Sequence, residues 1–290
     1  MDKMDKTEDL IKRIQDNYTQ LSKSQKIIAE YIINHYDKAA FMTAAKLGSS
    51  INISESTVVR FANTLGYDGY PELQSALQEL IKNKLTTVQR LEMTDETDEI
   101  SILNNVLKSD IENIRETIEE LDKNSFKKVV DSIFQAKKIY IIGFRSSTAI
   151  AEYLGFYLNL ILENVTVVKP GISDVFEQML RVSSDDLVIG IGFPRYSKRT
   201  IEVLKYAKSQ KAKIVTITDS LISPLTTVAD EVLLSKSNMA SFVDSLVAPL
   251  SLVNALIVSV GIKEKEKITD TFEKLESIWD EYGIYLSKTV

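Results

Sequence analysis

The sequence predicts a multidomain protein in which an all-α domain precedes an α/β domain built on a parallel sheet. Within residues 10–90, apolar residues recur at helical spacing, as in Ile27, Ile28, Tyr31 and Ile32. From residue 138 onward, short β-branched runs alternate with amphipathic stretches, the pattern of strands covered by helices on both faces. A length of 290 residues is sufficient for two such domains.

The first helix of the chain's all-α part contains Ile27, and Ser22 is its expected N-cap. Further helices are expected over residues 43–50, 55–65 and 70–84. Residues 86–100 are polar and acidic, which indicates a connection between domains. Helices are expected to follow over about 98–121 and 125–135. We therefore divide the chain into a helical domain (1–85), a linker with a connecting helix (86–124) and an α/β domain with C-terminal helices (125–290).

Five strands are expected in the α/β part, over residues 139–142, 165–168, 187–191, 214–217 and 231–234. Two long helices, about 241–260 and 264–286, complete the chain. Trp279, Tyr282 and Tyr285 near its end are candidates for packing between subunits, although packing within one chain explains them nearly as well.

The composition excludes several classes of site. The chain contains no cysteine, so disulfides, zinc–thiolate clusters and thiol catalysis are excluded. The single histidine leaves no basis for a metal site, and no cofactor is expected. The charged start does not resemble a signal peptide, and the most apolar stretch, 246–262, is interrupted by Pro249 and Ser251. We expect a cytoplasmic protein without a membrane partner.

The net charge of −6 does not favour nucleic-acid binding, since DNA-binding chains are more often basic. Residues 1–90 contain 12 basic and 11 acidic side chains, whereas the remainder contains 23 and 30. This asymmetry has the sign expected of an N-terminal DNA-binding domain, but it is small.

Residues 43–67 fit two helices joined by a four-residue turn at 51–54. Ala45 is expected where the helices approach each other, and Ser54 is expected to cap the second helix by accepting from the backbone of Ser56 or Thr57. Inward positions in that helix are predicted for Val58, Val59, Ala62 and Leu65.

The opposite face of this second helix presents two small polar residues, Ser56 and Thr57, and one turn later a basic residue, Arg60. A recognition helix places such residues in the major groove, where they contact phosphates or base edges. The candidate DNA contacts are Lys46, Ser54, Ser56, Thr57 and Arg60. An ordinary helical bundle with a capped helix remains the alternative, and Lys46 taken singly is more simply a solvated side chain.

Four segments in order carry a family resemblance: residues 21–32 (LSKSQKIIAEYI), 54–61 (SESTVVRF), 65–67 (LGY) and 69–71 (GYP). They resemble the N-terminal domain of RpiR-type (MurR/RpiR) transcriptional regulators. The resemblance implies a three-helix core with flanking helices that binds operator DNA as a homodimer or higher homo-oligomer. It also implies that Ser54, Ser56, Thr57 and Arg60 face the DNA.

Two strand-to-helix loops in the α/β part are candidates for binding an anion: residues 143–149 (GFRSSTA) and 192–200 (GFPRYSKRT). Helix N-termini at the carboxyl ends of strands favour anions through their N–H groups and dipoles. Arg145, Arg195, Lys198 and Arg199 add positive charge. The candidate ligand-binding residues are Gly143, Arg145, Ser146, Ser147, Arg195, Tyr196, Ser197 and Thr200. The alternative is that Ser146 and Ser197 only cap helices; neither loop carries a nucleotide-binding motif.

Residues 125–262, with these two loops, resemble the SIS (sugar isomerase) domain. The resemblance implies a flavodoxin-like parallel sheet and a phosphosugar ligand. Gly143 and Ser147 match the family's first loop, G-x-G-x-S, but Arg145 replaces its second glycine. In the second loop, S-x-S-G-x-T, Gly192 and Pro194 stand at the serines, Arg195 at the glycine and Ser197 at the threonine. Hydroxyls are thus lost and arginines gained, so we expect a bound phosphate with direct arginine contacts.

These features together predict a phosphosugar-responsive transcriptional regulator, without enzymatic activity, that controls genes of carbohydrate metabolism. The alternative is a sugar-phosphate isomerase, which needs a histidine or glutamate base beside the sugar carbon. The α/β part contains no histidine, and Glu152, Glu163 and Glu177 show no catalytic pairing. DNA binding without a ligand would leave the basic loops unexplained.

Asp219, after the fourth strand, could contact a sugar hydroxyl or only shape its loop.

Overall fold

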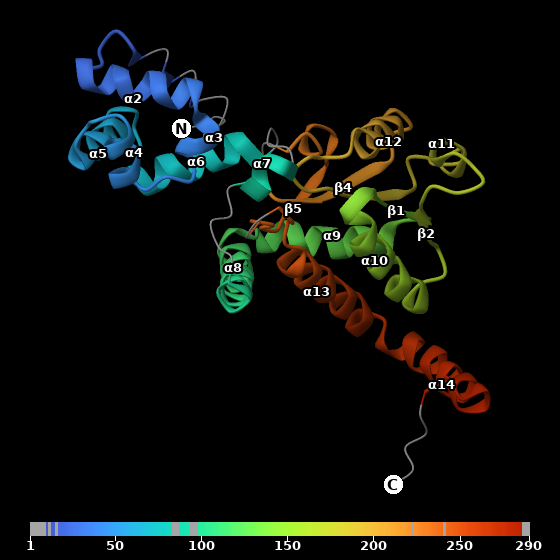
Figure 1. Ribbon diagram of the computed structural model, residues 1–290. Helices are drawn as coiled ribbons and strands as arrows, with labels where there is room; N and C mark the ends of the chain where they lie inside the picture. The colour runs from blue at the N-terminus through green and yellow to red at the C-terminus, as the bar shows by residue number, and fades with distance from the viewer. Residues whose placement is uncertain are drawn as a thin grey trace. The chain divides into compact units, whose positions relative to one another are not determined.

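The computed structural model describes residues 10, 13–14, 17–82, 87–92, 98–221, 223–239 and 242–285 (Figure 1). The chain divides into two compact units, Met1–Thr97 and Asp98–Val290. Parts of the expected helices and of the connection, at 83–86, 93–97 and 286–290, lie outside the described residues.

The first unit is entirely helical within its described residues. Its helices are α2 (Lys23–Asn34), α3 (Tyr36–Ala39), α4 (Ala44–Ser50), α5 (Glu55–Thr64), α6 (Tyr70–Lys82) and α7 (Thr87–Glu92). Helix α5 packs against α2, α4 and α6 and so forms the centre of the unit. Its core contains Ile28 and Ile32 of α2, Leu47 of α4, Phe61 of α5 and Leu73 of α6, all fully buried.

The N-terminal end of α2 confirms the predicted cap. The Ser22 side chain accepts from the backbone of Gln25, and the Gln25 side chain accepts from the backbone of Ser22. This reciprocal pair satisfies two N–H groups that the helix itself leaves unpaired. Helix α3 was not predicted, because four residues are too few for a periodic apolar pattern.

The second unit confirms the predicted α/β fold with a parallel sheet. Helices α8 (Glu99–Glu120) and α9 (Lys123–Gln135) precede strand β1 (Ile139–Gly143). Then follow α10 (Thr148–Ile161), β2 (Val165–Val168), α11 (Val175–Gln178), β3 (Leu187–Ile191), α12 (Lys198–Ser209), β4 (Lys213–Thr218) and β5 (Glu231–Leu234). The strand order β2-β1-β3-β4-β5, with every pair parallel, is the flavodoxin-like order.

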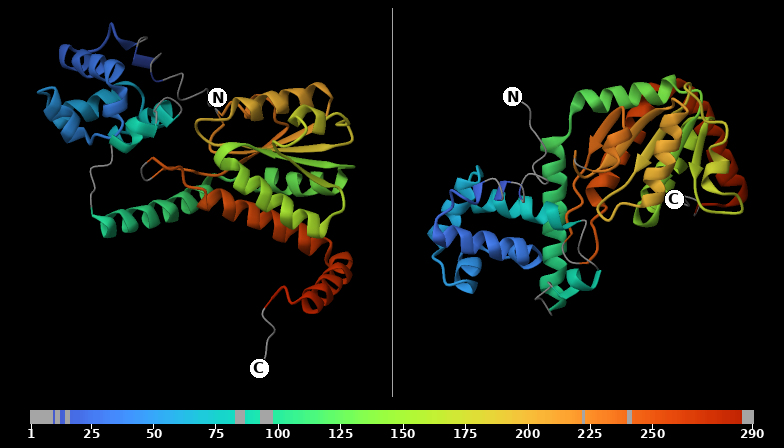
Figure 2. Two further views of the ribbon diagram at one scale, coloured as in Figure 1. Left: turned by 45° about the vertical axis from the view of Figure 1, so that its right-hand side comes forward. Right: turned by 90° about the horizontal axis from the view of Figure 1, so that it is seen from above.

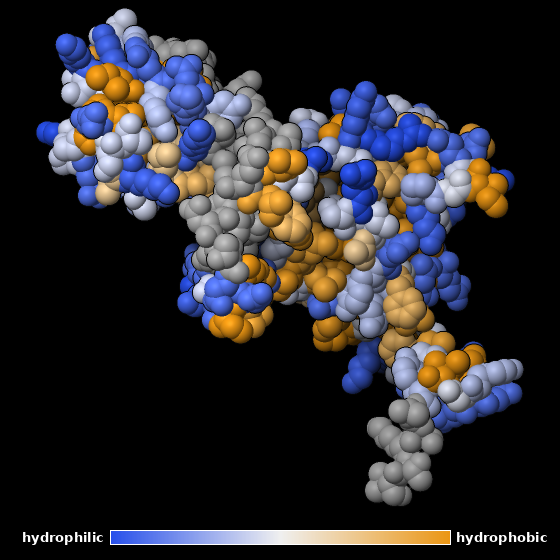
Figure 3. Space-filling view, in the orientation of Figure 1, coloured by the Kyte–Doolittle hydropathy of each residue, from blue (hydrophilic) through white to orange (hydrophobic). Residues whose placement is uncertain are grey.

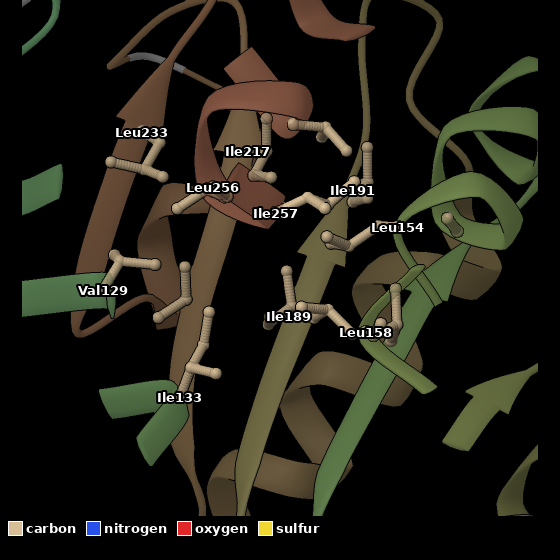
Figure 4. Packing of buried hydrophobic residues seen from close by; sticks show 14 of the residues in the cluster. Val129, Ile133, Leu154, Leu158, Ile189, Ile191, Ile217, Leu233, Leu256 and Ile257 are labelled. Atoms are coloured by element: carbon tan, nitrogen blue, oxygen red, sulfur yellow. The ribbon is translucent and has the colours of Figure 1, made fainter. Parts of the chain in front are cut away.

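Both faces of the sheet are covered by helices, as Figure 2 shows. On one face, Ile189 and Ile191 of β3 pack among side chains of α9, α10 and α13 (Val247–Lys263), including Val129, Leu154 and Leu256 (Figure 4). On the other face, residues of β1, β3 and β4 pack against Val203, Leu204 and Ala207 of α12. This burial on both faces explains the nearly continuous apolar strand sequences.

The C-terminal helices differ from prediction in their limits. Helix α13 begins at Val247 rather than near residue 241, and α14 covers Lys265–Tyr282. Tyr282 and Tyr285 are exposed, so they are not core residues of this chain. Within the described ranges no single helix is long and apolar enough to cross a bilayer; α13 and α14 pass that test only together, as a pair bent by 108°.

Candidate functional sites

Helices α4 and α5 form the predicted helix pair, joined by the turn at residues 51–54. The prediction that Ala45 lies at their closest approach is wrong, because Ala45 is exposed. Gly48 occupies that place: a Cβ atom there would lie 2.4 Å from the carbonyl oxygen of Ile53. The amide of Ile53 donates to the Gly48 carbonyl at 2.8 Å, which fixes the turn. Only glycine permits this approach.

The buried face of α5 contains Val58, Phe61 and Ala62, with Leu65 directly after the helix. Val59 is only partly buried, and Phe61, absent from the predicted inward set, is fully buried. The other face leaves Ser56 and Arg60 exposed, as predicted, and Lys46 is exposed on α4.

Ser54 stands at the N-cap position of α5, but its side chain makes no hydrogen bond to the helix backbone, contrary to prediction. Its hydroxyl instead pairs with those of Ser56 at 3.1 Å and Thr57 at 2.8 Å. Arg60 donates from Nε to the Ser56 carbonyl and from a terminal nitrogen to the Thr57 hydroxyl, each at 3.2 Å. The four side chains therefore form one connected polar surface whose groups can exchange these bonds for bonds to DNA.

Helix α6 holds the start of α4 in place through two side-chain hydrogen bonds. The Tyr70 hydroxyl donates to the Met42 carbonyl at 2.7 Å, immediately before α4, and Gln74 donates to the same oxygen at 3.1 Å. Burial raises the pKa of Tyr70 to about 12, so its hydroxyl stays protonated and remains a donor at neutral pH.

In the second unit the two predicted loops begin side by side. Strands β1 and β3 are neighbours, and Gly143 at the end of β1 pairs in register with Ile191 at the end of β3. The chain continues from β1 to the β2 side of the sheet and from β3 to the β4 side. In open α/β sheets, ligands generally bind outside the carboxyl ends of the strands at such a reversal of strand order.

The first loop forms a tight 3-10 turn over Arg145–Ser147, from which α10 continues. A Cβ at Gly143 would lie 2.7 Å from the Ser147 carbonyl oxygen, so glycine is required where the loop folds back. Ser147 is buried at the start of α10, whereas Arg145 and Ser146 are exposed.

The second loop leads into α12, whose N-cap is Ser197. The Ser197 hydroxyl accepts from the backbone of Thr200 at 3.4 Å, which supports the capping alternative for this residue. The Thr200 hydroxyl is buried and has no hydrogen-bond partner among the described residues. The Tyr196 hydroxyl donates to buried Asp219 at 2.7 Å, so Asp219 at least fixes the loop after β3.

Arg145 and Arg195 share an unusual backbone conformation, with φ of 63° at both residues. This left-handed region costs a residue with a side chain about 1–2 kcal/mol, whereas glycine adopts it freely. Both arginines stand at glycine positions of the SIS pattern. The two loops have therefore kept the backbone that glycine would allow and carry guanidinium groups instead.

Not all of the predicted positive charge is available. Arg199 pairs with Asp174 at 2.5 Å and lies over the Phe176 ring, and Lys198 pairs with Glu202 at 3.6 Å. These pairings weaken the expectation that four basic residues surround the site. Arg145 and Arg195 are exposed.

Two of the three glutamates considered as catalytic bases are held by ordinary structural partners. Glu152 is ion-paired with Lys169 at 3.5 Å, and Glu177 accepts from the Asp174 backbone in the capping box of α11. Glu163 is exposed after α10. No cluster of three metal-ligating side chains occurs within the described ranges.

A shallow cleft of about 480 Å³ lies at the opposite edge of the sheet, lined by residues that include Lys137, Asp186 and Lys213. It is located at the amino ends of β1, β3 and β4. We favour the carboxyl edge as the ligand site, because the helix N-termini and the reversal of strand order are at that edge.

Comparison with known proteins identifies both units. The SIS domain family matches residues 132–259, and the helix-turn-helix domain of the rpiR family matches residues 8–84. An uncharacterised HTH-type transcriptional regulator of Clostridium perfringens is 25% identical over 276 residues, covering 91% of this chain and 95% of its own. The HTH-type transcriptional regulator HexR of Escherichia coli is 28% identical over 216 residues, covering 73% and 72%.

Solved structures agree with this relationship. The sugar isomerase domain of an RpiR transcription factor from Sphaerobacter thermophilus is 26% identical with a TM-score of 0.58, covering 60% of this chain and 98% of its own. The NanR protein of Vibrio vulnificus, solved in complex with ManNAc-6P, shares the fold with a TM-score of 0.56 and 23% identity, covering 94% and 98%. With a helix-turn-helix domain of the rpiR family followed by a SIS domain, the chain belongs to the RpiR-type transcriptional regulators.

Proposed function

We propose that this regulator binds a phosphorylated sugar or sugar derivative at the loops following β1 and β3 and thereby changes its affinity for operator DNA. The observation that carries the proposal is the strand order, which sets two helix-initiating loops next to each other at the reversal point. The regulated genes would be those of carbohydrate metabolism, and the protein would act in the cytoplasm as a homo-oligomer.

The phosphate would lie between the two loops. Backbone N–H groups at the starts of α10 and α12 would donate to an anion there, and both helices are long enough to have a substantial dipole. Ser147 and the Thr200 hydroxyl, which has no partner among the described residues, would supply further donors, and the Arg145 and Arg195 side chains would supply charge-assisted ones. NanR, which shares the fold, binds a sugar phosphate, ManNAc-6P.

Operator DNA would be contacted by α5 with Ser54, Ser56, Thr57 and Arg60, and by Lys46 of α4. The exposed polar face of α5 supports this assignment. Its side chains bond mainly to one another, so they could turn to DNA without breaking contacts that hold the fold. Arg60 has the length and charge to reach guanine or phosphate.

A route from the ligand to the DNA-binding unit runs through α8. Residues 236–238 follow β5 on the carboxyl side of the sheet and are hydrogen-bonded to Asn113 and Thr117 of α8. A ligand that shifts this edge would also shift α8, whose N-terminus connects to the first unit. A ligand alters DNA affinity only if it binds the two arrangements unequally.

The proposal is tested by a thermal-shift screen of phosphorylated sugars and amino sugars with the full chain. A bound ligand stabilises the folded state by about 2.7 kcal/mol at a concentration 100 times its dissociation constant. We expect at least one phosphorylated compound to raise the melting temperature and its unphosphorylated form to have no effect. Equal shifts with both forms would contradict a phosphate site.

A further inference from the structure

We propose that an exposed apolar stripe on α8 is a homodimer interface, in which the α8 helices of two chains pack antiparallel. The stripe comprises Ile100, Leu103, Leu107, Ile111 and Ile118, which are 53–68% exposed. Successive members are three, four, four and seven residues apart, spacings that place them along one side of the helix. Hydrophobic surface on α8 is visible beside its charged side chains in Figure 3.

Helix α8 is attached to its own unit by a different, polar face. Asn113, which is fully buried, donates to the Asn238 carbonyl and accepts from the Asn238 amide, both at 2.9 Å. Thr117 accepts from the Lys236 amide at 2.9 Å, and Asp110 accepts from the Ser245 hydroxyl. At 3.6 residues per turn, Asn113 and Thr117 lie about a third of a turn from the stripe.

This arrangement reverses the usual one, in which an amphipathic helix buries its apolar face and exposes its polar face. Hydrogen bonds to the segment 236–238 fix the orientation of α8, so the helix cannot rotate to bury the stripe without breaking them. The first part of the helix, through Lys108, is exposed on all sides. A row of large exposed apolar residues of this kind marks an interaction surface.

The pattern of the stripe itself favours a second copy of this chain as the partner. The stripe is nearly symmetrical about Ser109: Ile100 and Ile118 are equally distant from it, and so are Leu107 and Ile111. Two such helices packed antiparallel around a two-fold axis at Ser109 bring Ile100 opposite Ile118 and Leu107 opposite Ile111, whereas Leu103 lies opposite Arg115. An interface of this type uses the same patch on both subunits and must complement itself.

The charges beside the stripe complement each other in the same alignment. Lys108 and Glu112 lie one turn apart on one side of the stripe, and the symmetry places Lys108 of each chain beside Glu112 of the other. Within one chain Glu112 pairs with Arg115, whereas Lys108 makes no ion pair among the described residues. In the antiparallel pair, Lys108 of each chain would gain one acidic partner, Glu112 of the other chain.

The interface is tested first by the mass of the full chain in solution, measured by sedimentation equilibrium. We expect two chains for the wild type and one chain for Leu107→Glu, because the two substituted residues would put a buried acid on each side of the interface. Leu107 is exposed in the single chain, so the variant should fold. Leu180→Glu, at a residue that is 74% exposed in another part of the surface, is the matched control and should leave the dimer intact. A monomeric wild type, or a dimeric Leu107→Glu variant, overturns the proposal.

A charge-reversal experiment distinguishes this partner from the chain's own DNA-binding unit. Lys108→Glu and Glu112→Lys should each raise the dimer dissociation constant, roughly tenfold, since each turns two attractive pairs into repulsive ones. Mixing the two variants should restore wild-type affinity, because every pair across the mixed dimer is then again of opposite charge. No recovery in the mixture would overturn the antiparallel α8 pair, including the case in which α8 is covered by the first unit.

Discussion

The exposed face of α5 and the carboxyl edge of the sheet both present arginine together with hydroxyl groups near the start of a helix, but the backbones that carry the arginines differ. Arg60 lies within a regular helix, and its neighbours Ser54 and Thr57 hold one another by hydrogen bonds. Arg145 and Arg195 lie in left-handed turns that cost about 1–2 kcal/mol each for a residue with a side chain. The candidate DNA-binding surface therefore lies on a relaxed helix, whereas the candidate ligand site holds its arginines in strained loops.

The largest expected effect is a loss of ligand binding that leaves DNA binding unchanged. We expect the double variant Ser147→Ala and Arg195→Ala to lose the ligand-induced stabilisation, about 2.7 kcal/mol at 100 times the wild-type dissociation constant, while binding DNA normally. Thermal shift and a DNA-binding assay measure the two properties separately. A variant that still responds to the sugar phosphate would remove these residues from the site.

A second prediction concerns the close approach that shapes the DNA-binding pair. Gly48→Val should destabilise the first unit by about 1–3 kcal/mol, because its side chain would collide with the Ile53 carbonyl. Ala45→Val on the exposed side of the same helix is the control and should cost far less. Hydrogen exchange of the two units shows whether the loss is confined to the first. Equal losses from the two substitutions would be incompatible with the observed contact.

The third prediction tests whether α5 reads DNA. Arg60→Ala should weaken binding to the preferred DNA sequence by about 1–3 kcal/mol if Arg60 contacts a base. Lys46→Ala should weaken binding to all sequences alike and lower the salt dependence by about one unit, as expected for a phosphate contact. Lys23→Ala, exposed on α2, serves as the control. Unchanged affinity of the Arg60 variant in a fluorescence anisotropy titration would exclude Arg60 from the interface.

The smallest expected effect tests the strain directly. Arg145→Gly and Arg195→Gly should each raise the free energy of unfolding by about 1 kcal/mol while weakening the ligand, since glycine relieves the left-handed backbone and removes the charge. Lys211 has a φ of 66° at the opposite edge of the sheet and provides a matched control. Lys211→Gly should stabilise the fold equally without changing ligand binding. Urea denaturation with and without ligand measures both quantities; a ligand affinity unchanged in the two arginine variants would refute the role of their side chains.

The predictable parts of the molecule were those encoded locally. Ser22 caps α2 as predicted, with Gln25 three residues later completing a capping box, and the five strands were recognisable from their apolar runs. Phe61 and Gly48 were missed because their importance depends on which neighbouring helix each one meets. Ser54 was assigned to the correct position, but the competing hydroxyls of Ser56 and Thr57 decide where its side chain bonds.

The candidate ligand site depended on longer-range information. Each loop could be found from its strand and its hydroxyl groups, but their adjacency follows from the pairing of β1 with β3, between residues far apart in the chain. The pairing of Arg199 with Asp174 likewise joins two separate connections of the sheet. The left-handed φ of both arginines agrees with the glycine positions inferred from the SIS pattern, whereas only their charge was used to predict the site.

The most direct test of the proposed regulator is the effect of a sugar phosphate on DNA affinity. A DNA fragment selected from a random pool by the wild-type protein would be titrated with the chain, with and without the compound that most raises its melting temperature. We predict that the compound changes the affinity of the wild type for this DNA by about 5-fold to 150-fold, the usual range of coupling between sites. The same titration with the Ser147→Ala and Arg195→Ala double variant should show no change. Wild-type affinity that does not respond to the bound sugar phosphate would contradict the account.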